Sequence, residues 1–153
     1  MVMNADMKRV VEQQRLGFVA TVCPDGTPNL SPKGTLSVLD DDHLGFADLR
    51  SPGTIANLRA NPAIEVNVVD PIIRKGYRFK GRAELLESGS EFERLVAFFG
   101  DRGLPEAPRR IRVIVRIRVD QARPLVSPGY DWIADEASMR AHWIQIHLGE
   151  DAP

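Results

Sequence analysis

Residues 17–34 read GFVATVCPDGTPNLSPKG, and this stretch decides the fold. Phe18 to Val22 is rich in β-branched residues that alternate in size, which predicts a strand. Pro24-Asp25-Gly26 is a hairpin signal, because proline fixes the entry dihedral and Asp-Gly supplies the positive dihedrals of the turn. The return strand carries Pro28 and Pro32, and a sheet tolerates proline only at an edge or a bulge. The stretch therefore predicts a hairpin at the edge of a split or interrupted barrel.

Short apolar runs and turn signals continue to alternate along the rest of the chain. Further strands are expected over residues 35–39, 44–47, 63–69, 77–86 and 111–120. Helices are expected from Asn4 or Asp6 to Gln14 with Gly17 as the stop, from Ser51 to Asn61, from a capping box at Ser88–Glu91 to Gly100, and from Asp135 to Leu148.

Mostly antiparallel strands with short connections favour a closed or partly closed barrel over a doubly wound sheet. The predicted fold class is mainly β with peripheral helices: a split β-barrel of six or seven mostly antiparallel strands and three or four short helices. At 153 residues, the length predicts a single domain over residues 1–153.

Composition limits the class of protein. A hydrophobic fraction of 43% and a charged fraction of 27% are ordinary for a globular chain, and a net charge of -1 provides no basic field for nucleic acid. The single Cys23 excludes an internal disulfide, fits a reducing compartment and has no activating neighbours. No apolar run reaches the length of a signal peptide core or a membrane span, so we expect a cytoplasmic protein without a membrane partner.

Several kinds of site are not expected. The chain has no GxGxxG, P-loop, GxSxG or paired-cysteine motif. His43 lies in a turn, and His142 and His147 are five residues apart in the last helix, so no metal site is predicted.

The order of these elements resembles the FMN-binding split-barrel family that includes pyridoxamine 5′-phosphate oxidase. Three segments carry the resemblance: residues 17–34, LGFADLRSPGTIANLRANPAIEVNVV at 44–69, and GYRFKGRAE at 76–84. The resemblance implies a homodimer that holds FMN at its interface. It also implies a flavin-dependent oxidoreductase, in which a small-molecule substrate exchanges a hydride or electrons with the flavin.

The resemblance also implies which residues contact the cofactor. In the family, the strand after the first hairpin lines the flavin. The start of the next helix, Arg50 to Thr54, is a candidate phosphate cradle, because a helix N-terminus exposes N–H groups and a partial positive charge. Relatives commonly have Ser-Arg-Lys there, whereas this chain has Gly53-Thr54. Without that lysine, other cations of this chain would have to bind the phosphate. The implied cofactor-binding residues are Ser31, Pro32, Lys33, Gly34, Arg50, Ser51, Thr54, Arg78, Lys80 and Trp132.

Each of these patterns also has a structural explanation. Lys33 can be a solvated lysine at a kinked strand end, and Ser51-Pro52 caps a helix with or without a ligand. The row of Arg78, Lys80 and Arg82 can be a solvated strand face. Trp132, with Tyr130 and Trp143, can pack in the core or at a dimer contact, although in relatives this region approaches the flavin of the neighbouring subunit. The arginines of a later stripe are expected on a solvated face or in salt bridges to a partner: Arg109, Arg110, Arg112, Arg116 and Arg118.

Other functions remain open at this point. One is a non-catalytic flavin- or haem-related binding module for stress response or redox sensing. Another is a reductase that uses a deazaflavin in place of FMN. Pyridoxamine 5′-phosphate oxidase itself is disfavoured, because its C-terminal substrate motif with arginine and histidine is not evident in PLVSPGYDWIADEASMRAHW at 124–143. No residue stands out as a general acid or base.

Overall fold

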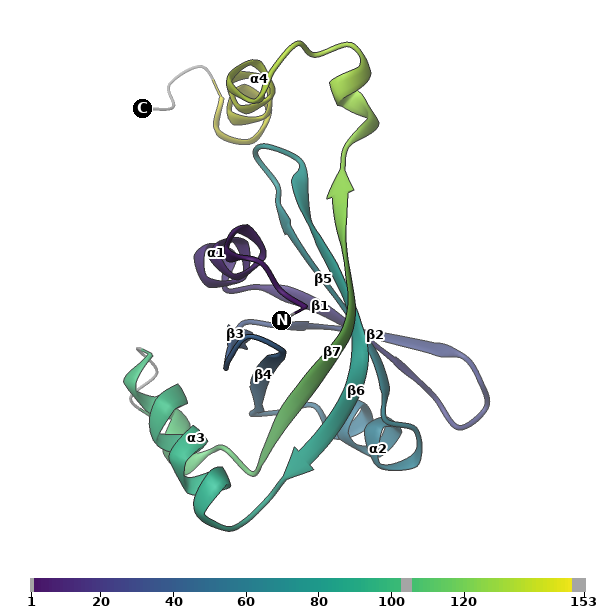
Figure 1. Ribbon diagram of the computed structural model, residues 1–153, viewed down its shortest axis with the longest axis vertical. Coiled ribbons are helices and arrows are strands. Elements are labelled where there is room, and N and C mark those ends of the chain that lie inside the picture. Colours follow the sequence, from purple (N-terminus) through teal and green to yellow (C-terminus); the bar gives the residue numbers. More distant parts are fainter. Residues whose placement is uncertain (1, 103–105, 150–153) are drawn as a thin grey trace.

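A computed structural model describes residues 2–102 and 106–149. One antiparallel sheet has the strand order β2-β1-β5-β6-β7-β4-β3 and curls into a half-barrel (Figure 1). Its strands are β1 (Gly17–Val22), β2 (Pro28–Lys33), β3 (Ser37–Val38), β4 (His43–Asp48), β5 (Ala63–Asp70), β6 (Lys75–Leu86) and β7 (Val113–Val126). The helices are α1 (Ala5–Gln14), α2 (Pro52–Ala60), α3 (Ser90–Asp101) and α4 (Glu136–Leu148), with 3-10 turns η1 (Ala107–Arg109) and η2 (Pro128–Asp131). The predicted split barrel is confirmed.

The core fills the curl of the sheet. Helix α1 contributes Val10 and Val11, which belong to the same buried cluster as Val19, Phe46 and Phe79. Helix α3 packs through a second cluster, and α4 lies beyond the end of β7, away from the other helices (Figure 1). In α1 and α3 the apolar side chains spaced along one side of the helix therefore face the sheet.

The first hairpin forms as expected. β1 and β2 pair from Val22↔Pro28 to Gly17↔Lys33, and Gly26 adopts a positive φ of 84° in the turn. β2 lies at the edge of the sheet. Pro28 and Pro32, which have no N–H to donate, are tolerated there because only one side of an edge strand is paired. This hairpin determines the position of Lys33, at the end of β2 opposite Gly17.

The expected ends of two helices are wrong. Helix α1 stops at Gln14, where Arg15 takes a left-handed φ of 50°, and Gly17 instead opens β1. The capping box at Ser88–Glu91 does not form, because Gly89 is the N-cap of α3 and makes no side-chain cap bond. The carboxylate of Glu91 accepts hydrogen bonds from Arg94 and Arg116 instead. Helix α3 also continues through Gly100 to Asp101.

The expected bounds of two strands also change. β3 is limited to Ser37–Val38, and β7 begins at Val113 rather than Ile111 but continues to Val126 rather than Asp120. The second half of β7 reads QARPLV, which has no alternating pattern. It is nevertheless a strand because β6 pairs along its whole length, with one bulge between Lys80 and Gly81. Pairing with the long strand β6 therefore determines the structure of this segment more than its local sequence pattern does.

The bulge generates a stability prediction. A Cβ on Gly81 would lie 1.9 Å from the backbone oxygen of Arg118, so Gly81→Ala must displace the β6–β7 ladder. We expect a loss of about 1–3 kcal/mol in the free energy of unfolding, measured by urea denaturation. Gly53→Ala in helix α2 is the control, because its Cβ meets nothing within 4 Å. Equal stability of the two variants would contradict the close approach.

Candidate functional site

A buried lysine marks the site. Lys33 is only 5% exposed, and its Nζ donates a hydrogen bond to the Ser31 hydroxyl at 2.8 Å and another to the Ser51 hydroxyl. Ser31 and Lys33 share the inward side of β2, and Ser51 immediately precedes α2. The Nζ atom also lies 5.6 Å from the ring centroid of Phe46, within the range of a cation–π contact. These three residues, Ser31, Lys33 and Ser51, are called the Lys33 cluster below.

The Lys33 ammonium has no anionic partner among the described residues at ion-pair distance. Burial lowers the pKa of Lys33 from its ordinary value of 10.5, because the charged form loses water, and the nearby carboxylate of Asp48 opposes this shift. The Oδ1 atom of Asp48 is itself buried without a hydrogen-bond partner in the described part of the chain. The two hydrogen-bond partners of the Lys33 ammonium are therefore neutral hydroxyls. Such a cation is suited to bind an anion.

The start of helix α2 reinforces the positive character of the cluster. Ser51 occupies the N-cap position but its side chain makes no cap bond, and its hydroxyl contacts Lys33 instead. The first N–H groups of α2 therefore lack this side-chain acceptor, and the helix directs its partial positive charge toward the cluster. Thr54, by contrast, is buried in the first turn. Asn57 has a structural role, since its Nδ2 donates to the Thr21 hydroxyl at 3.1 Å and ties α2 to β1.

An arginine-rich cavity of about 650 Å³ adjoins Ser51. It arises from strand register: Asp48 at the end of β4 pairs with Val113 at the start of β7. The residues that follow β4 therefore lie beside those that precede β7. This cavity, called the arginine pocket below, is lined by Asp48, Leu49, Arg50, Ser51, Pro52, Ile55, Ala56, Arg59, Arg109, Arg110, Arg112 and Val113.

Two basic residues among the implied cofactor contacts lie away from the Lys33 cluster within this chain. Arg78 and Lys80 lie on the exposed face of β6, where both pair with Glu65, at 2.8 Å and 3.4 Å. Pro32 and Gly34 flank Lys33, but Pro32 is exposed on the side of β2 opposite to Lys33, beside Phe18. The structure thus brings together Ser31, Lys33 and Ser51, with Arg50 alongside.

The aromatic residues near the C-terminus have different partners among the described residues. Trp132 is 75% exposed, and the Tyr130 hydroxyl donates to the backbone oxygen of Ile73 at 2.6 Å. Trp143 stacks instead with the guanidinium of Arg74, 3.4 Å from its ring centroid. Trp132 therefore lies apart from the Lys33 cluster in the single chain.

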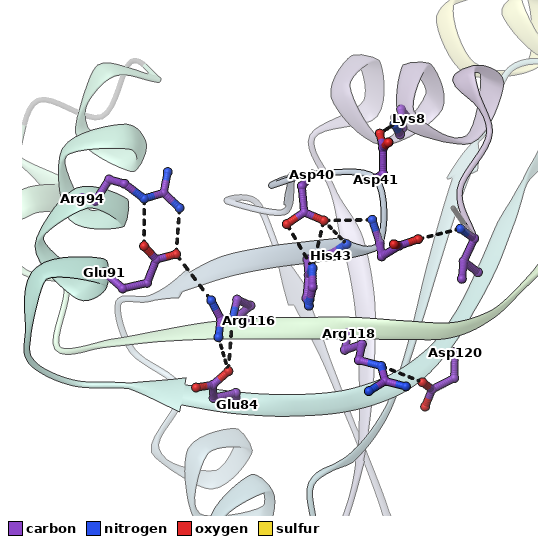
Figure 2. A network of polar contacts seen from close by, with 12 residues as sticks. Lys8, Asp40, Asp41, His43, Glu84, Glu91, Arg94, Arg116, Arg118 and Asp120 are labelled. Carbon is purple, nitrogen blue, oxygen red and sulfur yellow. Dashed lines mark hydrogen bonds and ion pairs between the residues drawn. The ribbon is translucent and has the colours of Figure 1, made fainter.

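Part of the basic stripe lies on β7 and forms salt bridges with acidic residues of the same chain. Figure 2 shows Arg116 between Glu84 of β6 and Glu91 of α3, and Arg118 beside Asp120. The remaining arginines of the stripe, Arg109, Arg110 and Arg112, line the arginine pocket. Their spacing in the sequence could not reveal this, because it depends on the pairing of β4 with β7.

Residues 2–102 and 106–149 show neither a metal site nor a membrane-spanning helix. No group of three or more histidine, cysteine, aspartate or glutamate side chains there could hold a metal ion. His43 pairs with Asp40 at 2.9 Å, at the start of β4 (Figure 2). No helix in this part of the chain has both the length and the apolar character needed to cross a membrane.

Comparison with solved structures supports the fold. HupZ from Group A Streptococcus matches with a TM-score of 0.73 and 28% identity, covering 82% of this chain and 95% of that one. An FMN-binding protein from Syntrophomonas wolfei matches with a TM-score of 0.66 and 16% identity over 79% and 84% of the two chains. A structure described as an F420 reductase matches with a TM-score of 0.63 and 24% identity over 79% and 98%.

No curated protein matches the sequence. The sequence model of the pyridoxamine 5′-phosphate oxidase family, however, matches residues 3–125. This range contains the whole β-sheet but for its last residue, together with the Lys33 cluster and the arginine pocket. The chain belongs to the pyridoxamine 5′-phosphate oxidase family.

Proposed function

We propose that this protein binds FMN, with the phosphate at the Lys33 cluster, and works as a flavin-dependent oxidoreductase on a small molecule. The observation that carries the proposal is the buried Lys33 ammonium, whose hydrogen-bond partners are two neutral serine hydroxyls. A phosphate there would gain a charge-assisted contact with Lys33 and the partial positive charge of the start of α2. The name of the Syntrophomonas wolfei protein, an FMN-binding protein with the same fold, agrees with this choice of cofactor.

The residues present fit a phosphate and leave the redox chemistry to the flavin. A bound flavin supplies the capacity to accept and donate electrons. Lys33 would hold the phosphate, and Ser31 and Ser51 would keep the Lys33 amine oriented toward it. Arg50, beside Ser51 in the arginine pocket, would add positive charge to the same end of the cofactor. The protein's part is thus anchoring and orientation.

We further infer that the protein is a homodimer that covers the outer face of β1 and β2, with FMN at the interface. Phe18 is 46% exposed and Leu30 is 66% exposed, on neighbouring strands. Val22 is also exposed on this face. The prolines of β2 disfavour edge-to-edge pairing, so a second copy would pack on the face rather than extend the sheet. A two-fold interface of this kind would remove the apolar patch from water.

A non-catalytic flavin-binding protein is the second candidate. In the described residues, the Lys33 cluster has no histidine nearby, since His43 pairs with Asp40 and the other two histidines lie on α4. The acidic residue nearest to Ser51 in the sequence is Asp48.

Anaerobic addition of NADPH to the FMN-loaded protein separates the candidates: bleaching of the flavin supports a reductase, and an unchanged spectrum favours storage or sensing. The absorption spectrum also distinguishes FMN from a deazaflavin.

The cofactor proposal predicts that Lys33→Met and Arg50→Ala each weaken FMN binding. One charge-assisted contact is worth about 1.5–3 kcal/mol, so affinity should fall about tenfold or more for Lys33→Met. Titration of the FMN-free protein, followed by quenching of flavin fluorescence, measures this. Arg123→Ala removes an exposed arginine elsewhere on β7 and should change nothing. Riboflavin, which lacks the phosphate, should bind the parent and all three variants alike. Unchanged FMN affinity in Lys33→Met would remove the cluster from the cofactor site.

The dimer proposal predicts that Leu30→Glu yields a monomer with weakened FMN binding, because a charge would be buried in the apolar interface. Leu30→Met preserves size and apolar character and should remain dimeric. Sedimentation equilibrium at micromolar concentration measures the mass, and the FMN titration measures the cofactor. A dimeric Leu30→Glu variant would reject this interface, and a monomer with full FMN affinity would reject the placement of FMN between subunits.

A further inference from the structure

Strands β6 and β7 place arginines directly opposite each other on the outer face of the sheet. Arg78 is paired with Arg123 across the two strands, and Arg82 is paired with Arg118. All four side chains are exposed. Like charges directly opposite each other destabilise a sheet, so the stability of the isolated chain does not account for this arrangement.

The next outward position along the same two strands shows the usual arrangement. There Glu84 of β6 lies opposite Arg116 of β7, and the two side chains form an ion pair (Figure 2). The like-charged pairs instead flank the β-bulge, and Lys80, which precedes the bulge, lies between them. The five cations are called the cationic strip below: Arg78, Lys80, Arg82, Arg118 and Arg123.

The chain compensates only part of the charge of the cationic strip. Glu65 of β5 contacts two of its members, at 2.8 Å and 3.4 Å, and Asp120 lies 3.4 Å from a third. Arg82 and Arg123 form no ion pair and no side-chain hydrogen bond within residues 2–102 and 106–149. Three positive charges are therefore in excess on this surface, although the chain as a whole has a net charge of -1.

The cationic strip is an open surface rather than a binding cavity. The hollow at its centre, next to Gln121, has a volume of about 140 Å³, which is below the usual size of a small-molecule site. A larger hollow of about 530 Å³ lies beside Lys80 and Arg82, but Glu65 and Asp120 also line it, so its charges are balanced. The excess charge is thus spread over exposed side chains, which suits a macromolecule with charges of its own.

The pattern of side chains favours an acidic polypeptide over nucleic acid. Tyr77 and Phe79 alternate with the cations of β6 and pack against the core on the other side of the sheet, so the strip has no aromatic platform for stacking bases. The cations of β6 follow one another at every second residue, about 7 Å apart, and an extended peptide presents its alternate side chains with the same spacing. Guanidinium groups also bind carboxylates through two parallel hydrogen bonds.

We propose that the cationic strip is a docking surface for an acidic segment of another protein, bound in extended form with carboxylates at alternate positions. Docking would neutralise the two like-charged pairs of β6 and β7. The strip lies on the outer face of the sheet, whereas Lys33 is buried on the inward side of β2. It is also distinct from the apolar patch of β1 and β2. The proposal therefore depends neither on FMN nor on the dimer.

Fluorescence anisotropy with a dye-labelled peptide of alternating glutamate and threonine tests this proposal. The peptide should bind the FMN-free protein at low ionic strength, and added salt should weaken the binding. Arg82→Gln and Arg123→Gln should each lower the affinity about two- to fivefold, and the double variant about tenfold, which is the scale of exposed ion pairs. Neither change breaks an ion pair among the described residues, so neither should lower the urea midpoint of unfolding.

Arg140→Gln is the matched control. It removes an exposed arginine of α4 that likewise has no ion pair in the described part of the chain, and α4 lies beyond the end of β7 (Figure 1). The net charge changes as it does in Arg82→Gln and Arg123→Gln, but the affinity for the peptide should stay the same.

Several results would overturn the proposal. Absence of binding at low ionic strength would remove the docking surface. An equal loss of affinity in Arg140→Gln would show that only the overall charge matters. A peptide of the same composition with its glutamates consecutive should bind more weakly, and equal binding would reject the alternating carboxylates. A single-stranded oligonucleotide of equal charge that bound more tightly, and lost affinity in the same variants, would make the strip a nucleic-acid surface instead.

Discussion

An ammonium group removed from water loses hydration that only anions or well-placed oxygen atoms can replace. Lys33 receives two serine hydroxyls and an aromatic face, and in the described residues no carboxylate lies within ion-pair distance. The pKa of Lys33 is lowered for the same reason, because burial removes water from the charged amine. A phosphate at the cluster would offset the lost hydration and favour the charged amine. The fold is thus prepared for an anion at this point, and the cofactor proposal follows from that imbalance.

Two strand pairings bring the necessary groups together. The β1–β2 hairpin places Lys33 and Ser31 on the inward side of an edge strand. Arg50 and Ser51 follow shortly after the last residue of β4. The register of β4 with β7 then places Arg109, Arg110 and Arg112 next to the start of α2. Residues separated by about half the chain therefore lie close together at the start of α2.

Local sequence signals predicted the hairpin and the order of elements, because turn chemistry and side-chain alternation act over a few residues. They failed where longer pairing decides the outcome: the second half of β7 is a strand only because β6 runs beside it. The hydroxyl of Ser51 looked like a helix cap, but it contacts Lys33 instead. Likewise, nothing in the spacing of Arg109, Arg110 and Arg112 separates them from the salt-bridged Arg116.

The most direct test of the central claim is the pH titration of the Lys33 side-chain nitrogen, followed by NMR with nitrogen-labelled lysine. In the ligand-free protein, Lys33 should titrate below its ordinary pKa of 10.5. FMN should raise this pKa, because the phosphate stabilises the charged amine, whereas riboflavin should raise it little or not at all. A Lys33 pKa that is the same in the free, FMN-loaded and riboflavin-loaded protein would contradict the placement of the flavin phosphate at this cluster.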